Sequence, residues 1–191
     1  MTEKLLNGNR KFREGEFAKE KEYYAKLAQG QSPSTLWIGC SDSRVGPERI
    51  TGSRAGDLFV HRNIGNVVAV NCMSFATVAE YAINHLKVKE IVVCGHSDCG
   101  AMKALAAGKE GGDAFIPLWL NNAAEAKQRV EKMGAPAGDR EKRTALEKEN
   151  VRVQLEHLRA YPLVKKAIAE GRVTVRGLYY DLSTGTLSEV A

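Results

Sequence analysis

The sequence predicts an α/β protein with a mostly parallel central sheet, about four parallel strands plus an antiparallel edge strand, flanked by helices. Two short apolar runs, at residues 35–40 and 91–93, are typical of buried strands. Between them, the apolar residues of 75–86 recur at the three- and four-residue spacing of one helix face. Because this helix leads directly into the second run, the order strand, helix, strand indicates a right-handed parallel crossover.

The rest of the chain is expected to supply the outer strands and further helices. Residues 2–29 are expected to be helical, with a break near Gly15. Loops are expected at 108–112 and 134–139, where glycine is frequent. The other predicted elements are a strand at 57–62, helices at 114–133, at 140–159 and after Pro162, a core strand at 173–181 and an antiparallel edge strand at 187–190.

We expect residues 1–191 to form a single domain, with an α/β core at 30–191 and a helical arm at 1–29. In the arm, Phe12, Phe17 and Tyr24 are spaced too widely for an ordinary packed face, and charged residues fill the gaps between them. The arm therefore needs another surface to pack on.

Charge and hydropathy argue against two classes of partner. The formal net charge is +5, but Lys and Arg are interleaved with Glu at 19–22 and 140–149, which favours a solvated surface over a nucleic-acid interface. No apolar run is long enough to span a bilayer, and the first residues lack the apolar segment of a signal peptide. We therefore expect a cytoplasmic protein without nucleic-acid or membrane partners.

Cysteine and histidine follow the predicted strands where reactive groups of open parallel sheets gather. Cys40 and His96 each follow a strand, and Cys99 precedes a predicted helix, whose N-terminus favours a thiolate. Two thiolates and one imidazole suit Zn²⁺ and leave a fourth position open to water or to the nearby Asp42. A hydrogen-bonded core histidine is the alternative interpretation of His96, and Cys72 and Cys94 are expected to be structural.

Two motifs, Cys-Ser-Asp-Ser-Arg at 40–44 and His-Ser-Asp-Cys-Gly at 96–100, together resemble the β-class carbonic anhydrases, and the resemblance covers nearly the whole chain. It implies that zinc binds to Cys40, His96 and Cys99. It further implies a zinc lyase, carbonate dehydratase, that reversibly hydrates carbon dioxide to bicarbonate and a proton with a hydroxide that zinc makes available.

The same resemblance implies that Asp42 and Arg44 form an active-site dyad. An aspartate paired with a guanidinium stays ionised and can orient the attacking hydroxide. In some family members the dyad aspartate replaces water as the fourth zinc ligand and closes the site. Bicarbonate in a side pocket stabilises that closed state, and the positions that match this pocket are Trp37, Arg62 and Tyr180. Ordinary strand aromatics are the alternative interpretation of Trp37 and Tyr180.

By resemblance, the substrate pocket is formed by Gln31, Phe59, Ile64, Tyr81 and Gly100. Gln31, Phe59 and Tyr81 are typically supplied across a dimer interface in the family, and the helical arm wraps the partner subunit. The resemblance therefore implies an obligate homodimer or a dimer of dimers. From their pattern alone, Phe59, Ile64 and Tyr81 are equally compatible with a plain core.

Two other functions stay open at this stage. A relative on this scaffold could hydrolyse carbon disulfide or carbonyl sulfide, which are linear molecules like carbon dioxide. A structural zinc module is the non-catalytic alternative, but such sites usually close with four protein ligands. A zinc nucleobase deaminase is excluded, because the chain has neither a His-x-Glu nor a Pro-Cys-x-x-Cys motif.

Overall fold

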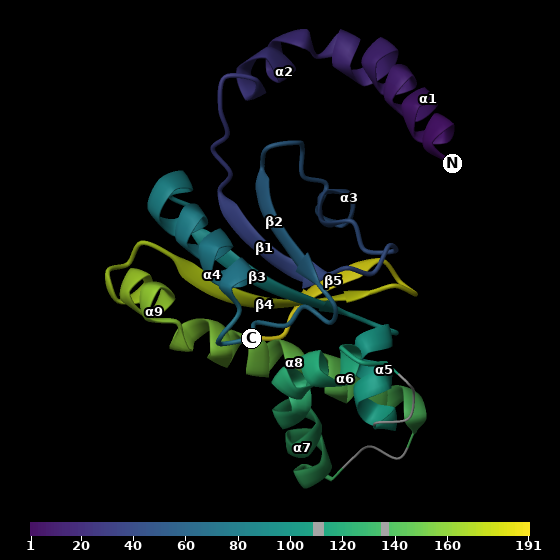
Figure 1. Cartoon of the computed structure of the whole chain (residues 1–191), viewed down its shortest axis with the longest axis vertical. Coiled ribbons are helices and arrows are strands. Elements are labelled where there is room, and N and C mark those ends of the chain that lie inside the picture. Colours follow the sequence, from purple (N-terminus) through teal and green to yellow (C-terminus); the bar gives the residue numbers. More distant parts are fainter. Residues whose placement is uncertain (109–112, 135–137) are drawn as a thin grey trace. The chain divides into compact units, whose positions relative to one another are not determined.

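The structure is a computed structural model that describes residues 1–108, 113–134 and 138–191 (Figure 1). Most of the two predicted loops, 109–112 and 135–137, therefore lies outside the described residues. The chain forms two compact units, Met1–Ser32 and Pro33–Ala191. Within the described ranges, no helix combines the length and the apolar character that crossing a membrane requires.

The first unit is helical, and its irregular turn contains Gly15, where a break was predicted. The rings of Phe12, Phe17 and Tyr24 pack against one another, with the closest centroids, those of Phe17 and Tyr24, 4.9 Å apart. No side chain of residues 1–32 is buried, so this unit has no core of its own. Its elements are α1 (Thr2–Phe12), a π-helical turn (Arg13–Phe17) and α2 (Lys21–Leu27).

The second unit contains a five-stranded sheet in the order β2-β1-β3-β4-β5. The first four strands are parallel to their neighbours, and β5 runs antiparallel to β4 at the edge, which confirms the predicted fold class. The third strand continues to His96, three residues beyond the predicted run. The strands are β1 (Thr35–Cys40), β2 (Leu58–Asn63), β3 (Glu90–His96), β4 (Thr174–Asp181) and β5 (Thr186–Glu189).

Helices connect and cover the strands. The predicted helix at 75–86 begins earlier, as α4 (Met73–Glu80), and continues as a π-helix (Tyr81–Leu86). The predicted helix at 114–133 is divided into three consecutive pieces, and α3 was not predicted because five residues show no helical period. The remaining bounds are α3 (Pro47–Thr51), α5 (Gly100–Ala107), α6 (Ile116–Leu120), a 3₁₀ turn (Asn121–Ala123), α7 (Ala124–Lys132), α8 (Asp139–Ala160) and α9 (Pro162–Ala169).

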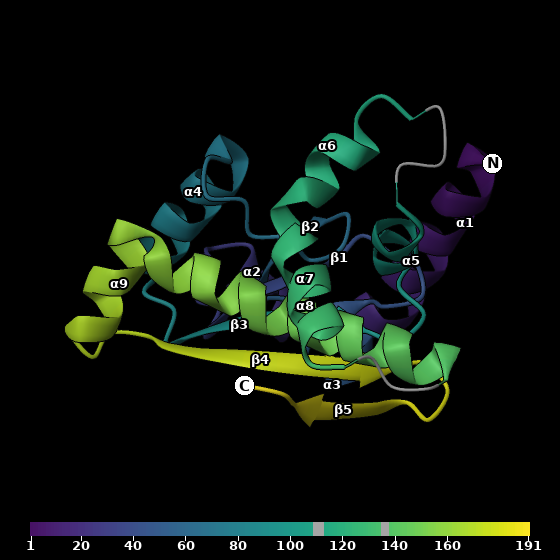
Figure 2. The same ribbon diagram turned by 90° about the horizontal axis from the view of Figure 1, so that it is seen from below.

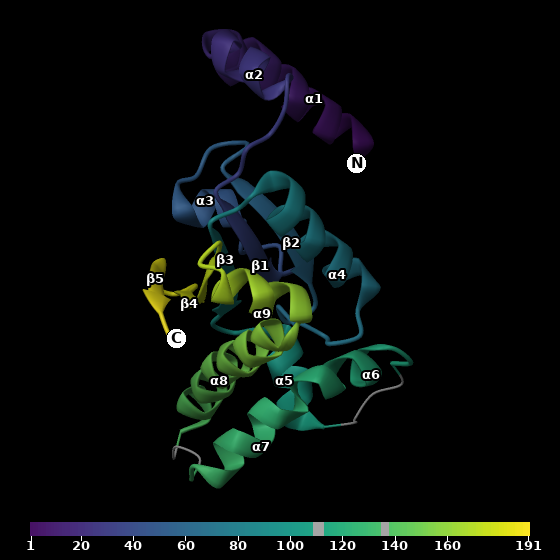
Figure 3. The same ribbon diagram turned by 90° about the vertical axis from the view of Figure 1, so that its left-hand side faces the viewer.

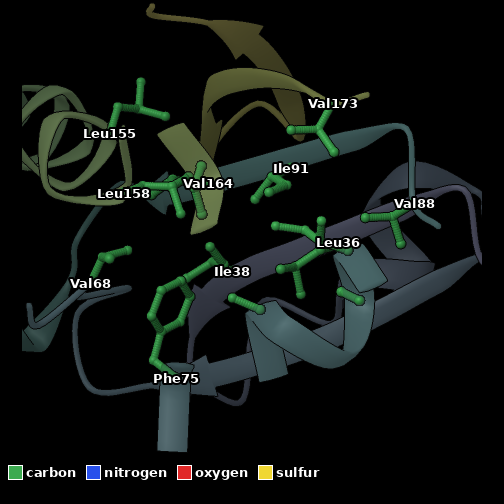
Figure 4. Packing of buried hydrophobic residues seen from close by; sticks show 14 of the residues in the cluster. Leu36, Ile38, Val68, Phe75, Val88, Ile91, Leu155, Leu158, Val164 and Val173 are labelled. Carbon is green, nitrogen blue, oxygen red and sulfur yellow. The ribbon is translucent and has the colours of Figure 1, made fainter. Parts of the chain in front are cut away.

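Successive side chains of β1 and β3 point to opposite faces of the sheet. Leu36, Ile38 and Ile91 face one side, where they pack under α4, α8 and α9 (Figure 4). Trp37 and Cys94 belong to the opposite face, which α3 covers, and Figure 3 shows α3 and α4 on either side of the strands. Both faces of the central strands are thus buried, as a parallel sheet requires.

Helix α8 lies along β3 and β4 (Figure 2). Two glycines allow this close packing. A Cβ at Gly95 would lie 2.7 Å from Val151 of α8, and a Cβ at Gly177 would lie 2.7 Å from Leu155 of the same helix. Since real side chains do not approach so closely, only glycine at these positions permits α8 to contact the strands directly.

Candidate metal centre

Three potential metal ligands meet at the carboxyl ends of two neighbouring strands. Cys40 is the last residue of β1, His96 is the last residue of β3, and Cys99 directly precedes α5. Because β1 and β3 are adjacent and parallel, their ends lie side by side. The ligand atoms of the three residues all lie within 4.8 Å of one another, and all three residues are buried. The predicted juxtaposition is confirmed.

The donor set fits a zinc ion. Tetrahedral Zn–S bonds of about 2.3 Å place two sulfurs about 3.8 Å apart, a separation compatible with this cluster. His96 Nδ1 donates to the backbone oxygen of Ser97 at 2.9 Å, which leaves the lone pair on Nε2. Among the described residues, Nε2 is buried without a hydrogen-bond partner. A buried acceptor of this kind calls for a ligand such as a metal.

The two thiols of the cluster are electrostatically coupled. The Cys99 thiol donates to the Cys40 sulfur, which lowers the pKa of Cys40 to about 4 and raises the pKa of Cys99. Backbone N–H groups of Asp42 and Gly65 further stabilise the Cys40 thiolate. Ionisation of the Cys40 thiol therefore makes ionisation of the Cys99 thiol less favourable. A divalent cation between them would remove this conflict and allow both sulfurs to bind as thiolates.

Asp42 and Arg44 form a bidentate salt bridge beside the cluster. Arg44 Nε and Nη2 donate to the two carboxylate oxygens at 3.0 and 2.7 Å. The guanidinium holds the pKa of Asp42 well below its usual range, so the carboxylate is ionised. Asp42 Oδ2 lies 3.9 Å from His96 Nε2, so the carboxylate is adjacent to the metal-ligand group, where the predicted dyad needs it.

The sequence analysis did not identify the side chains that stabilise the turn between His96 and Cys99. Asp98 adopts a left-handed conformation with φ of 59° and accepts a hydrogen bond from Arg44 Nη1 at 3.0 Å. The Cys99 N–H donates to Glu147 of α8 at 3.1 Å. The interpretation of 140–149 as a solvated surface was wrong for Glu147 and Glu149, which are 2% and 3% exposed. Burial of these two carboxylates is tolerated because hydrogen bonds and ion pairs satisfy their oxygen atoms.

Comparison with known proteins agrees with this geometry. The family model described as carbonic anhydrase matches residues 35–187. The chain is 42% identical over 167 residues to a carbonic anhydrase of Candida albicans, covering 85% of this chain and 58% of the relative. It is 37% identical over 187 residues to a carbonic anhydrase of Pseudomonas aeruginosa, covering 96% of this chain and 84% of the relative. The chain belongs to the carbonic anhydrase family.

Solved structures define the class of this carbonic anhydrase. A tetrameric β-carbonic anhydrase of Sordaria macrospora superposes with a TM-score of 0.92 at 34% identity, covering 98% of this chain and 95% of that one. A β-carbonic anhydrase of Coccomyxa, solved with acetazolamide, gives a TM-score of 0.90 at 34% identity, with coverages of 97% and 84%. The β class predicted from the two motifs is therefore confirmed, and with it zinc as the cofactor that the buried cluster fits.

Of the residues expected to line the carbonic anhydrase substrate pocket, Phe59 and Tyr81 of the second unit lie away from the metal cluster. Phe59 and Tyr81 are in ring contact, with centroids 5.8 Å apart. The strand register pairs Phe59 with Leu36 and Asn63 with Cys40, so Phe59 lies at the end of β2 remote from the cluster. Gln31 is exposed in the first unit. Gly100, by contrast, follows Cys99 directly, at the start of α5.

Ile64 does lie beside the cluster, and two aromatic residues that were not predicted lie with it. A pocket of about 400 Å³ is lined by Ser41, Asn63, Ile64, Phe115, Ile116 and Trp119, and its lining is almost wholly apolar. Trp119 Nε1 donates to the backbone oxygen of Ile64 at 2.8 Å. A contact between residues so distant in sequence leaves no local pattern, which is why Phe115 and Trp119 were missed.

Of the predicted bicarbonate-pocket residues, Trp37 and Tyr180 lie together and Arg62 does not join them. Trp37 and Tyr180 line a cavity of about 10 Å³ next to Cys40 and His96. That volume is about the size needed for one water, so this conformation has no room for bicarbonate. Arg62 instead donates to the backbone oxygens of Cys40 and Asp42 at 2.8 and 2.6 Å.

Proposed function

We propose that this chain catalyses the reversible hydration of carbon dioxide to bicarbonate and a proton, with Zn²⁺ held by Cys40, His96 and Cys99. The observation that carries the proposal is the buried sulfur, nitrogen, sulfur cluster with an ionised carboxylate beside it. Within the described part of the chain the ligand group has three members, which favours catalysis over a structural zinc module, whose four ligands usually come from the protein.

The residues around the cluster suit this reaction. Zinc, when bound, lowers the pKa of water and makes hydroxide available near neutral pH. Asp42, which Arg44 keeps ionised, is placed to accept a hydrogen bond from the reacting hydroxide and to direct its lone pair at carbon dioxide. The apolar pocket beside Ile64 and Trp119 suits a substrate without a net dipole.

We also propose that the working enzyme is an oligomer, with a homodimer as the minimal unit and a dimer of dimers as its extension. Tyr81 is 45% exposed although its ring contacts Phe59, so this aromatic pair is available to another subunit. In the arm, the side chains of Leu5 and Leu6 are 71% and 60% exposed, and the arm has no core into which they could pack. Both features support Gln31, Phe59 and Tyr81 entering a partner's pocket while residues 1–29 pack on that partner.

The free cysteines support a reducing compartment. None of Cys40, Cys72, Cys94 and Cys99 is in a disulfide. Because structural disulfides are rare in the cytosol, free thiols favour the predicted cytoplasmic location. Bicarbonate-linked closure through Trp37, Arg62 and Tyr180 stays a prediction, and it requires Arg62 to release two backbone oxygens.

Stopped-flow hydration of carbon dioxide, with zinc content measured on the same sample, tests the proposed function. We expect about one zinc per chain and hydration activity that disappears with chelation and returns with zinc. Stoichiometric zinc without hydration would favour a structural module. Turnover of carbon disulfide or carbonyl sulfide without hydration of carbon dioxide would favour a hydrolase.

A further inference from the structure

Glu147 is a buried acidic residue that is not itself a proposed zinc ligand. It contacts the metal loop, the segment from His96 to Cys99. It lies on α8 and is 2% exposed. Its Oε1 accepts the backbone N–H of Cys99 at 3.1 Å, and its Oε2 accepts the Tyr179 hydroxyl at 2.7 Å. One carboxylate therefore joins helix α8, strand β4 and a candidate zinc ligand.

The fold brings this carboxylate to the metal loop through the close packing of α8. A Cβ at Gly95 would lie 2.7 Å from Val151 and 3.5 Å from the backbone oxygen of Glu147. Gly95 immediately precedes His96, so the absence of a side chain there allows the helix to reach the end of β3. The position of Glu147 is thus fixed by the backbone, without dependence on a flexible loop.

The hydrogen bond from the Cys99 N–H to Glu147 influences the direction in which the Cys99 thiolate points. Cys99 follows Asp98, which occupies a strained left-handed conformation for a residue other than glycine. An external acceptor on the Cys99 N–H stabilises that turn and so determines where the Cys99 sulfur points relative to His96. A buried carboxylate is costly compared with an apolar side chain, so one kept at this place needs a compensating role.

We propose that Glu147 is a positioning residue of the metal centre, which orients Cys99 through its backbone N–H and thereby sets the affinity and geometry of the zinc site. This inference rests on the proposed function, because it assumes zinc at Cys40, His96 and Cys99. The competing explanation is that Glu147 only fastens α8 to Tyr179 of β4.

Three variants separate the two roles. Glu147→Leu removes both hydrogen bonds while keeping an apolar side chain of similar volume. Glu147→Gln keeps an acceptor for Cys99, and its amide N–H can donate to the Tyr179 hydroxyl, so it should rescue the site. Tyr179→Phe is the matched control, because it removes the bond to β4 and leaves the contact with Cys99 intact.

The measurements are zinc affinity by chelator competition and the visible spectrum of the cobalt(II)-substituted protein, which reports thiolate coordination. We expect Glu147→Leu to weaken zinc binding about 10- to 100-fold and to change the cobalt spectrum. Glu147→Gln and Tyr179→Phe should stay close to wild type in both. Where Glu147→Leu does not fold, Glu147→Asp withdraws the carboxylate by one methylene and should weaken zinc several-fold.

Equal zinc affinity and equal cobalt spectra in wild type and a folded Glu147→Leu or Glu147→Asp variant would overturn the inference. So would a Tyr179→Phe protein that loses zinc as strongly as Glu147→Leu, since the effect would then come from the helix contact. A wild-type protein that shows no thiolate-to-cobalt band would instead refute the proposed function, independently of the variants.

Discussion

The groups expected to react and the groups expected to hold the substrate are organised differently in this molecule. Cys40, His96 and Cys99 are buried together with an ionised carboxylate beside them, all within one chain. Phe59 and Tyr81 form an aromatic pair at the other end of β2, and Tyr81 is 45% exposed. The contrast indicates that one chain supplies the whole metal-ligand group, whereas we propose that Phe59 and Tyr81 serve the site of a second chain.

The largest effect should come from removing a ligand within the buried cluster. Cys99→Ala should lose stoichiometric zinc and lower kcat/KM by about 1000-fold or more, because a bound metal supplies several kcal/mol of transition-state stabilisation. Metal analysis and stopped-flow assays check this. Cys94→Ala is the matched control: Cys94 is also buried, and burial raises its pKa to about 12, but it lies outside the cluster. Loss of zinc from the Cys94→Ala control would show that the packing of buried residues, and not ligation by Cys99, determines zinc binding.

Arg44→Gln should produce the next largest effect, by freeing Asp42 without touching a ligand. The Arg44 guanidinium makes two hydrogen bonds to the carboxylate, and their loss would leave Asp42 held by the backbone N–H of residue 44 alone among its Arg44 contacts and let it move toward the metal. We expect kcat/KM to fall about 10- to 100-fold with zinc content unchanged. Zinc-edge absorption should then show an oxygen ligand from the protein.

Arg176→Gln, on β4, serves as the control for Arg44→Gln, because it removes arginine salt bridges, those with Glu90 and Glu189, from a different part of the sheet. It should leave both activity and zinc coordination unchanged. An Arg44→Gln protein with wild-type kcat/KM would show that the dyad does not act in the reaction.

Tyr81→Ala tests the other side of the comparison. If Tyr81 belongs to a neighbouring subunit's pocket, the variant should weaken self-association about 10-fold and raise KM more than it lowers kcat, with zinc retained. Sedimentation velocity and steady-state kinetics measure the two effects. Ile168→Ala, at an apolar residue of α9 that is 36% exposed, is the control and should change neither. A Tyr81→Ala protein that associates and turns over like wild type would place the substrate pocket within one chain.

The sequence predicted the parts of the molecule that depend on local pattern and topology. The bounds of β1 agree because an apolar run there ends at a polar loop, and the meeting of Cys40 with His96 follows from the parallel order of their strands. Glu147 escaped prediction because its helix carries charges throughout, and no local pattern distinguishes a buried glutamate from a solvated one. Phe115 and Trp119 escaped because their packing beside Ile64 depends on a tertiary contact.

The smallest effect should come from charges that belong to neither region. Arg129 of α7 donates to Glu156 of α8 at 2.7 and 2.6 Å, and this contact lowers the pKa of Glu156. A carboxylate whose pKa is lowered by folding stabilises the protein above its unfolded pKa of about 4.3, and that stabilisation is lost as the pH falls through the folded value. Because the Glu156 side chain is 51% exposed, its pair should be worth less than about 1 kcal/mol.

Glu156→Gln should therefore lower the free energy of unfolding slightly at neutral pH, and the difference from wild type should shrink as the pH falls below about 4. Urea unfolding at both pH values measures this, and zinc content and self-association should match wild type. Destabilisation that grows on acidification would contradict the assigned sign. A loss of zinc would mean that α8 transmits charge changes to the cluster, so the reacting groups would not be as self-contained as their burial within one chain implies.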